Sequence, residues 1–308
     1  MKSFYLKILL FLLPVFLVWG GLEYFYRTVE TNYTFKHKQI QASYDDTEIL
    51  IMGNSHTLYG LNPEFFSRPT FNLANTSQSL YFDELLLEKH LDSLSNLKAV
   101  VLAISYFSLS QADNTSDDIW RKYFYQEQMD LEVPIISEID PRGYSLALTR
   151  KFNRSYEFVK EYWQNGTALG CYENGYGIQD STDIVRDIER IAPIIAKKHE
   201  NGSMEFDNAI SRLERIIKRC AKHNVEVFLV EMPVHPLYYQ LLNEEKKYKI
   251  VESCTQLDSK LGNAHYISLS LDQRFQKSDL RDADHLTNQG AEKCSRILDG
   301  IVGRTLSN

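Results

Sequence analysis

The stretch that decides the fold runs from Glu48 to Gly60 and reads Glu-Ile-Leu-Ile-Met-Gly-Asn-Ser-His-Thr-Leu-Tyr-Gly. Its apolar run, Ile49 to Met52, is typical of a strand buried on both faces of a parallel sheet. Gly53 and Asn54 follow this run and favour a sharp turn. Ser55 therefore falls at the carboxyl end of a predicted strand, where open α/β sheets bind their ligands. The alternative is that Ser55 only caps the helix that follows, because serine is a favoured N-cap.

Apolar and amphipathic segments alternate along the rest of the chain. Buried strands are predicted at residues 99–104, 225–230 and 266–269, and a shorter apolar segment lies at 71–74. Helices are predicted at 80–95, 206–223, 243–261 and 291–302. This alternation predicts an α/β fold with a doubly wound, mainly parallel sheet between two layers of helices.

Length, composition and charge narrow the class of protein. The chain has 308 residues, of which 44% are hydrophobic and 24% are charged. This composition is typical of globular proteins, and the length allows one large α/β domain with an insertion. The formal net charge is −7 and no long basic run is present, which argues against a nucleic acid partner.

The first 27 residues are predicted to form a membrane anchor. Lys2 and Lys7 precede an apolar run at residues 8–22, and Trp19 and residues 24–26 supply aromatic rings for the far interface. The pattern favours an uncleaved single-pass helix with the rest of the chain outside the cytoplasm, on the periplasmic or extracellular side. The alternatives are a cleaved signal peptide, a lipid anchor or a buried core helix. Residues 28–46 are predicted to form a stalk, and residues 47–308 the folded domain.

Residues 113–205 interrupt the α/β alternation and are rich in aromatic and charged residues. We interpret them as an insertion with helices near 119–128 and 155–163. Insertions on α/β sheets often form the wall or lid of a site. The aromatic, Asn and Glu side chains around residues 172–177 would suit a sugar ring, and the alternative is a small satellite core.

The four cysteines are Cys171, Cys220, Cys254 and Cys294, which allow three disulfide pairings. Four buried thiols are an equally good interpretation. No Cys-x-x-Cys motif is present and no nearby histidine has metal-ligand spacing, so we predict neither a metal nor a cofactor.

A second informative stretch, residues 282–291, follows the last predicted strand and leads into the last helix. It contains Asp282, Asp284 and His285. In a doubly wound sheet this loop can lie at the same edge as Ser55, which would bring together a nucleophile, a base and an orienting carboxylate. The alternative is a surface histidine beside a helix cap with solvated aspartates.

The turn at residues 53–56 and the Asp282-x-x-His285 pair resemble the first and last motifs of the SGNH (GDSL-like) hydrolases. The resemblance covers residues 46–108 and 206–302 and is closest to the membrane-anchored bacterial branch found among envelope and exopolysaccharide O-acetylation proteins. It implies Ser55 as nucleophile, His285 as base and Asp282 as orienting acid. Adjacency leaves Asp284 open as an alternative acid.

Three departures from the family pattern concern the oxyanion hole and its surroundings. Asn54 replaces the family's Asp, and the Gly of the second motif corresponds to Ser77, whose backbone N–H would be an oxyanion donor. Ser105 and Tyr106 stand where the third motif has Asn, so Asn75 is the candidate substitute amide. One missing oxyanion donor typically costs about 10²–10³ in turnover.

Three further residues are candidate substrate contacts. His56 lies next to Ser55, and His235 and Tyr238 follow a predicted strand end. The alternative for His56 is a role in capping the turn, and ordinary loop packing is the alternative for the other two.

These features predict a serine esterase or O-acyltransferase, with acetyl as the expected acyl group, acting on an envelope or secreted glycan. The implied partners are an acylated glycan or acyl donor and a multi-span membrane acyltransferase. The rival from another class is a non-catalytic glycan-binding or assembly component with the same fold. A lipid-directed esterase is a third hypothesis, and it predicts a long apolar groove.

Overall fold

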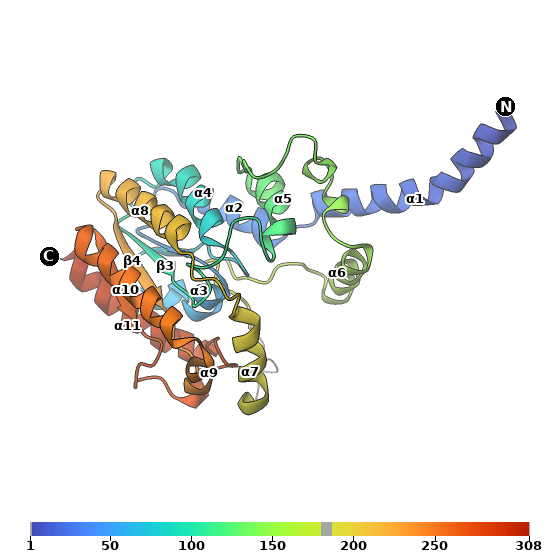
Figure 1. The fold of residues 1–308 in the computed structure, drawn as a ribbon. Helices are drawn as coiled ribbons and strands as arrows, with labels where there is room; N and C mark the ends of the chain where they lie inside the picture. The colour runs from blue at the N-terminus through green and yellow to red at the C-terminus, as the bar shows by residue number, and fades with distance from the viewer. Residues whose placement is uncertain (1, 180–186, 308) are drawn as a thin grey trace. The chain divides into compact units, whose positions relative to one another are not determined.

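The computed structural model describes residues 2–179 and 187–307, and its contacts divide the chain into two compact units. The N-terminal unit contains residues 1–37 and 119–170, and the sheet unit contains residues 38–118 and 171–308. The segment predicted as an insertion contributes to both units. Figure 1 follows the chain through both of them.

The sheet unit is built on five parallel strands: β1 (Ile49–Met52), β2 (Thr70–Asn72), β3 (Ala99–Ala103), β4 (Glu226–Glu231) and β5 (Ala264–Ser268). Their spatial order is β2-β1-β3-β4-β5. The predicted α/β fold with a doubly wound parallel sheet is therefore confirmed. The chain changes direction across the sheet between β1 and β3, and ligands bind at such a switch point in open α/β sheets.

Helices cover both faces of this sheet. Figure 1 shows α4 (Leu80–His90) and α8 (Asp207–Lys222) side by side on one face, and α11 (Asn288–Leu306) on the other. On the α11 face, alternate strand residues such as Ile49, Ile51 and Val101 pack against Leu298 and Val302. The remaining helices of the unit are α3 (Ser55–Gly60), α7 (Ile188–His199), α9 (Pro236–Leu241) and α10 (Glu244–Lys260).

Two of these helices were not predicted. Helix α7 contains Pro193, which weakens a helical pattern, and it falls in the stretch interpreted as an insertion. Helix α9 is only one to two turns long and begins at Pro236, the first helical position, where proline is well tolerated.

The N-terminal unit contains α1 (Lys2–Thr28), α5 (Asp118–Met129) and α6 (Phe152–Asn165), and α2 (Asn32–Ala42) follows α1 within the predicted stalk. Residues Phe4–Thr28 are long and apolar enough to cross a membrane, by length and composition. The unit has an aromatic core in which Tyr26 meets Phe124 edge-on at 5.6 Å and Tyr33 meets Tyr125 at 5.0 Å. Several of the insertion's aromatic residues therefore form a satellite core.

All four cysteines are buried, and Cys220, Cys254 and Cys294 form no disulfide. Burial raises the pKa of the Cys220 thiol to about 12. A thiol that stays protonated at neutral pH is a poor nucleophile and a poor metal ligand, so Cys220 has a packing role.

Candidate active site

The turn after β1 is shaped by its glycine. Gly53 has φ +113°, and a Cβ there would lie 2.6 Å from the Cβ of Ala103 on the neighbouring strand. The Oδ1 atom of Asn54 accepts a hydrogen bond from the backbone N–H of His56, which makes Asn54 the N-cap of α3. The alternative that Ser55 caps this helix is therefore wrong, because Ser55 is the first helical residue and its side chain is available for other contacts.

The side chains of Ser55, His285 and Asp282 form one hydrogen-bonded chain. Ser55 Oγ lies 2.9 Å from His285 Nε2, and His285 Nδ1 lies 3.0 and 3.1 Å from the two carboxylate oxygens of Asp282. Asp282 Oδ1 also accepts the backbone N–H groups of Asp284 and His285, at 3.0 and 2.8 Å. The loop thus fixes its own carboxylate beside the imidazole, which is the arrangement that orients a general base.

A second carboxylate approaches the same imidazole. Asp284 Oδ1 lies 3.2 Å from His285 Nδ1, and Asp284 Oδ2 lies 2.9 Å from His56 Nε2. The Asp284 side chain is 2% exposed, compared with 17% for Asp282. Asp284 therefore joins two histidines instead of serving one.

These carboxylates control the charge of His285. Burial lowers the pKa of His285, but the nearby carboxylates of Asp284 and Asp282 outweigh this effect and raise it to about 9. Burial raises the pKa of Asp284, yet the facing histidines hold it well below its ordinary value. The imidazole of His285 is therefore mostly protonated at neutral pH and becomes a free base as the pH approaches 9.

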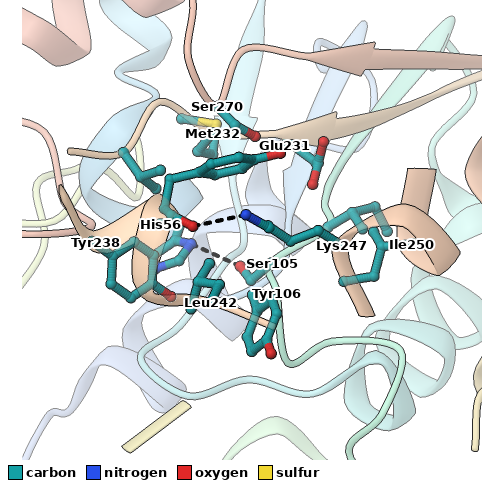
Figure 2. A pocket seen from close by; sticks show the side chains of 13 residues that line it. His56, Ser105, Tyr106, Glu231, Met232, Tyr238, Leu242, Lys247, Ile250 and Ser270 are labelled. Atoms are coloured by element: carbon teal, nitrogen blue, oxygen red, sulfur yellow. Dashed lines mark hydrogen bonds between the residues drawn. The ribbon is translucent and has the colours of Figure 1, made fainter. Parts of the chain in front are cut away.

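A second hydrogen-bonded chain of side chains contains the same residue types, Ser, His and Asp. Ser105 follows β3, and its Oγ lies 2.8 Å from His56 Nδ1, as the dashed line in Figure 2 marks. Asn54 Nδ2 donates to Ser105 Oγ at 2.9 Å. The adjoining cavity, which Tyr238 and Ser270 also line, has a volume of about 30 Å³. A cavity of this volume is large enough to hold water.

The loop after β2 carries the candidate oxyanion donors. Ser77 has φ +55°, the left-handed conformation that suits the family's glycine at this position. The backbone of Asn75 donates to Gly53 O at 3.1 Å, which holds this loop against the turn that carries Ser55. The Ser55 N–H, the Ser77 N–H and the Asn75 side-chain amide have no acceptor in residues 2–179 and 187–307. These three donors are therefore available to a ligand.

A buried carboxyl group links the turn that carries Ser55 to the loop that carries the candidate oxyanion donors. Asp83 Oδ1 accepts from Gly53 N at 2.9 Å and from Gln78 Nε2 at 2.7 Å. Burial raises the pKa of Asp83 to about 7. Asp83 was not among the predicted site residues, although it stands out as an acid inside an apolar helical pattern.

The other predicted contacts lie elsewhere. His235 caps α9, with its Nδ1 accepting the Leu237 N–H at 3.2 Å, and within the described ranges its ring bonds to none of Ser55, His285 and Asp282. The Tyr238 hydroxyl lies 2.8 Å from Nδ1 of His199, a residue of α7 that the sequence analysis missed. Burial lowers the pKa of His199 to about 4, so its imidazole is neutral at physiological pH.

Metal-ligand groups also meet here. His56, Asp284 and His285 bring potential ligand atoms within 4.8 Å of one another. His56 bonds to Asp284 within this cluster and to Ser105 outside it, and His285 bonds to Asp282. We assign no metal to it.

An open groove of about 850 Å³ lies in the same unit. The turn at residues 172–177 forms one wall, and Gly175 is needed there because a Cβ would lie 2.0 Å from Asn72 O. The Tyr176 hydroxyl bonds to Asn288 Oδ1 at 2.8 Å and to Tyr59 O at 3.2 Å, and the Tyr59 ring lies 6.1 Å from the ring of His285. The groove is lined by polar, acidic and aromatic side chains: Asn62, Glu64, Phe65, Tyr172, Glu173, Asn174, Tyr176, Asn288, Gln289 and Glu292.

Comparisons with known proteins find weak similarity. A protein-family model matches residues 174–307, which is less than half of the chain. No curated protein matches the sequence. The similar solved structures include a Bacteroides fragilis protein assigned as an acylhydrolase, with 11% identity over 87% of this chain and 94% of that chain and a TM-score of 0.42.

Two other solved structures are similar to the chain. A GDSL-like lipase from Bacteroides thetaiotaomicron has 10% identity, covers 90% of this chain and 98% of its own, and has a TM-score of 0.42. A Streptococcus pneumoniae protein assigned as a platelet activating factor has 15% identity, coverages of 87% and 92%, and a TM-score of 0.41. Likeness at these identities and TM-scores does not extend to function.

Proposed function

We propose that this chain is an SGNH-type serine esterase or O-acyltransferase in which Ser55 is the nucleophile, His285 the general base and Asp282 the orienting acid. The observation that carries this proposal is the 2.9 Å contact between Ser55 Oγ and His285 Nε2, at the carboxyl edge of the sheet. A serine hydroxyl becomes a useful nucleophile only when a base can take its proton, and this distance is within the range required.

The first half-reaction forms an acyl-enzyme. Neutral His285 takes the Ser55 proton at Nε2 while Ser55 Oγ bonds to the acyl carbon. The negative charge that develops on the carbonyl oxygen is stabilised by the N–H groups of Ser55 and Ser77 and by the Asn75 amide. When the bond to the leaving oxygen breaks, His285 returns the proton to the leaving alcohol.

The second half-reaction decides between hydrolysis and transfer. Water or a sugar hydroxyl gives its proton to His285 Nε2 while its oxygen bonds to the acyl carbon. The bond between that carbon and Ser55 Oγ then breaks, and the proton passes to Ser55. Exclusion of water from the acyl-enzyme would favour the sugar hydroxyl.

The substrate we propose is an acyl ester, most simply acetyl, on an envelope or secreted glycan. The groove beside Tyr59 supports this, because its amide, carboxylate and tyrosine side chains suit hydroxyl groups and the apolar face of a sugar ring. A lipid-directed esterase would need a long apolar groove, and these lining residues do not provide one.

The proposed location is outside the cytoplasm, with the chain attached by α1. Residues Phe4–Thr28 are apolar and exposed over the most hydrophobic part of the helix, as expected for a membrane anchor or signal sequence. If the enzyme is a transferase, a multi-span membrane acyltransferase is the partner we propose as acyl supplier.

The test is labelling of the full chain in detergent with a fluorophosphonate, which reacts with activated serines. We expect added mass on Ser55, and loss of that mass in the His285→Ala variant, because the variant has no base for the Ser55 proton. Acetate release from acetylated xylan, compared with hydrolysis of a long-chain p-nitrophenyl ester, then separates the glycan and lipid hypotheses.

Absence of a fluorophosphonate adduct on Ser55 would contradict the proposal. If folded protein gives no adduct on Ser55, or if His285→Ala labels as fast as the parent chain, the serine enzyme proposal is wrong. A non-catalytic glycan-binding component would then be the better proposal, with the groove as its binding site.

A further inference from the structure

One face of helix α6 packs against α1. Tyr26 OH donates to Ser155 Oγ at 3.0 Å, and the Phe25 ring meets Phe158 and Tyr162 edge-on at 5.8 and 5.3 Å. Both helices belong to the N-terminal unit, so this packing lies inside one body. These contacts attach α6 to the carboxyl end of the candidate membrane span.

A neighbouring face of α6 carries an apolar stripe that is largely exposed. Phe152, Tyr156, Val159 and Trp163 follow the spacing i, i+4, i+7 and i+11, which places them along one side of a helix. Phe152 is 62% exposed, Tyr156 57% and Trp163 80%. An exposed stripe of large aromatic side chains marks an interaction surface.

The neighbouring loop meets α1 deeper in the candidate span. Trp19 Nε1 donates to Ser145 Oγ at 3.0 Å, and Glu23 Oε2 accepts from Ser145 Oγ and from the Ala147 N–H at 2.7 and 3.0 Å. Tyr144 and Leu148, on either side of these contacts, are exposed. This part of the unit therefore lies level with the last two to three turns of the apolar helix.

The orientation and charge of α6 fit the same surface. Figure 1 shows α6 nearly end-on while α1 runs across the view, so α6 crosses the direction of α1. Lys151 and Arg154 are exposed at the start of α6, whereas Lys160 lies 3.6 Å from Glu157, and Glu161 is also exposed. Basic groups beside an apolar stripe are typical of helices that lie in a membrane surface and contact anionic headgroups.

We propose that α6 is an interfacial helix whose Phe152–Tyr156–Val159–Trp163 stripe is buried in a phospholipid bilayer at its outer headgroup boundary. We assign the bilayer as the occupant because α6 packs on the carboxyl end of α1. If a bilayer surrounds residues 4–19 and ends near Tyr26, it reaches α6, which contacts Phe25 and Tyr26. This inference depends on α1 being retained as an anchor, which is part of the proposed location, and does not depend on the chemistry at Ser55.

The test uses the full chain reconstituted into phosphatidylcholine–phosphatidylglycerol vesicles whose acyl chains are brominated near the headgroup. The chain has three tryptophans, Trp19, Trp120 and Trp163, so pairwise Trp→Phe substitutions leave one reporter at a time. Bromine quenches tryptophan only on contact. We expect Trp163 to lose most of its emission in brominated vesicles, and Trp120, which is stacked with Arg121 and Arg150, to keep its emission.

Each other outcome overturns the proposal in a recognisable way. Trp19 is the reporter of insertion, and unquenched Trp19 would refute both the anchor and the interfacial helix. If Trp19 is quenched while Trp163 responds only to aqueous iodide, α6 faces water and the proposal is wrong. If Trp163 is protected from both iodide and bromine, a second copy or another protein covers the stripe, and the bilayer is the wrong occupant.

Discussion

Two Ser–His–Asp chains lie next to each other in the sheet unit, and only one has the features of a catalytic site. Ser55–His285–Asp282 and Ser105–His56–Asp284 use the same residue types at similar hydrogen-bond distances. The His285 and Asp282 side chains are each 17% exposed, whereas those of His56 and Asp284 are 5% and 2% exposed. The first chain can meet a substrate, and the second is enclosed.

The surroundings of the two serines also favour Ser55 over Ser105 as the residue that can react. The Ser55 N–H has no acceptor among the residues that the structure describes, whereas the Ser105 N–H donates to Ser108 Oγ at 2.9 Å. Asn54 also donates to Ser105 Oγ, and the cavity beside it has a volume of about 30 Å³. Residue types and distances therefore do not identify a nucleophile by themselves, because access and an unused oxyanion donor are also required.

The largest expected effect comes from removing each serine in turn. Ser55→Ala should lower the kcat for p-nitrophenyl acetate by about 10⁴–10⁶-fold, as loss of a nucleophile in a serine hydrolase does. Ser105→Ala should lower it by about tenfold or less, because His56 keeps its bond to Asp284. Steady-state kinetics on the full chain in detergent measures both values.

Other results for the Ser55→Ala and Ser105→Ala variants would contradict this comparison of the two chains. Equal losses in the two variants would mean that the buried chain takes part in the chemical step. A larger loss in Ser105→Ala, with Ser55→Ala still active, would make Ser105 the nucleophile.

The next effect concerns the carboxylate that connects the two chains. In Asp284→Asn, the Asn Oδ1 can still accept from His56 Nε2, but the negative charge beside His285 is lost. The pKa of His285, raised to about 9 in the parent chain, should fall by about 1–3 units. Because the base works only when neutral, the rising limb of kcat/KM against pH should move to lower pH.

A control separates this charge effect from a general one. Glu244 is an exposed carboxylate on α10, and Glu244→Gln should leave the limb where it is. An unmoved limb in Asp284→Asn would show that Asp282 alone sets the pKa of His285, and Asp284 would then have only a structural role.

Sequence periodicity predicted the strands and most helices because each is a local pattern of burial. It also selected Ser55, Asp282 and His285, since the carboxyl ends of parallel strands meet at one edge. The Ser105–His56–Asp284 chain could not be predicted in this way, because it joins the start of α3 to two loops and depends on which way each side chain turns. The catalytic roles of the selected residues remain predictions that the labelling experiment tests.

Other features of the structure could not be predicted from the sequence, for a different physical reason. The aromatic residues at 119–170 carry no sign of whether they face a core or the outside, and the structure contains both cases, with Tyr125 buried and Trp163 exposed. His199 was missed because its helix was not predicted. Asp83 was missed because an acid in an apolar helix does not specify the backbone N–H that it accepts.

The smallest expected effect on turnover is at Asp83, which supports the turn of the exposed chain. Asp83→Asn should keep both bonds, because Gly53 N and Gln78 Nε2 donate to the same oxygen, Oδ1. Stability should respond instead. Burial raises the pKa of Asp83 to about 7, so between about pH 4 and pH 7 the folded state holds a proton that the unfolded state has lost. The parent chain should therefore lose stability relative to Asp83→Asn as pH rises, by about 1.4 kcal/mol per unit.

Urea unfolding of both proteins from pH 4.5 to pH 7.5 measures this difference, and the titration of the other acids cancels in the subtraction. A difference that does not change with pH would mean that Asp83 is ionised in the folded state, stabilised by the two donors despite its burial. A difference that grows until about pH 7 and then levels off would show that the turn below Ser55 rests on a carboxyl group that is half protonated near neutrality. The Ser105 turn, held by the neutral Ser108, should have no such dependence, so the two chains would differ in pH response as well as in access.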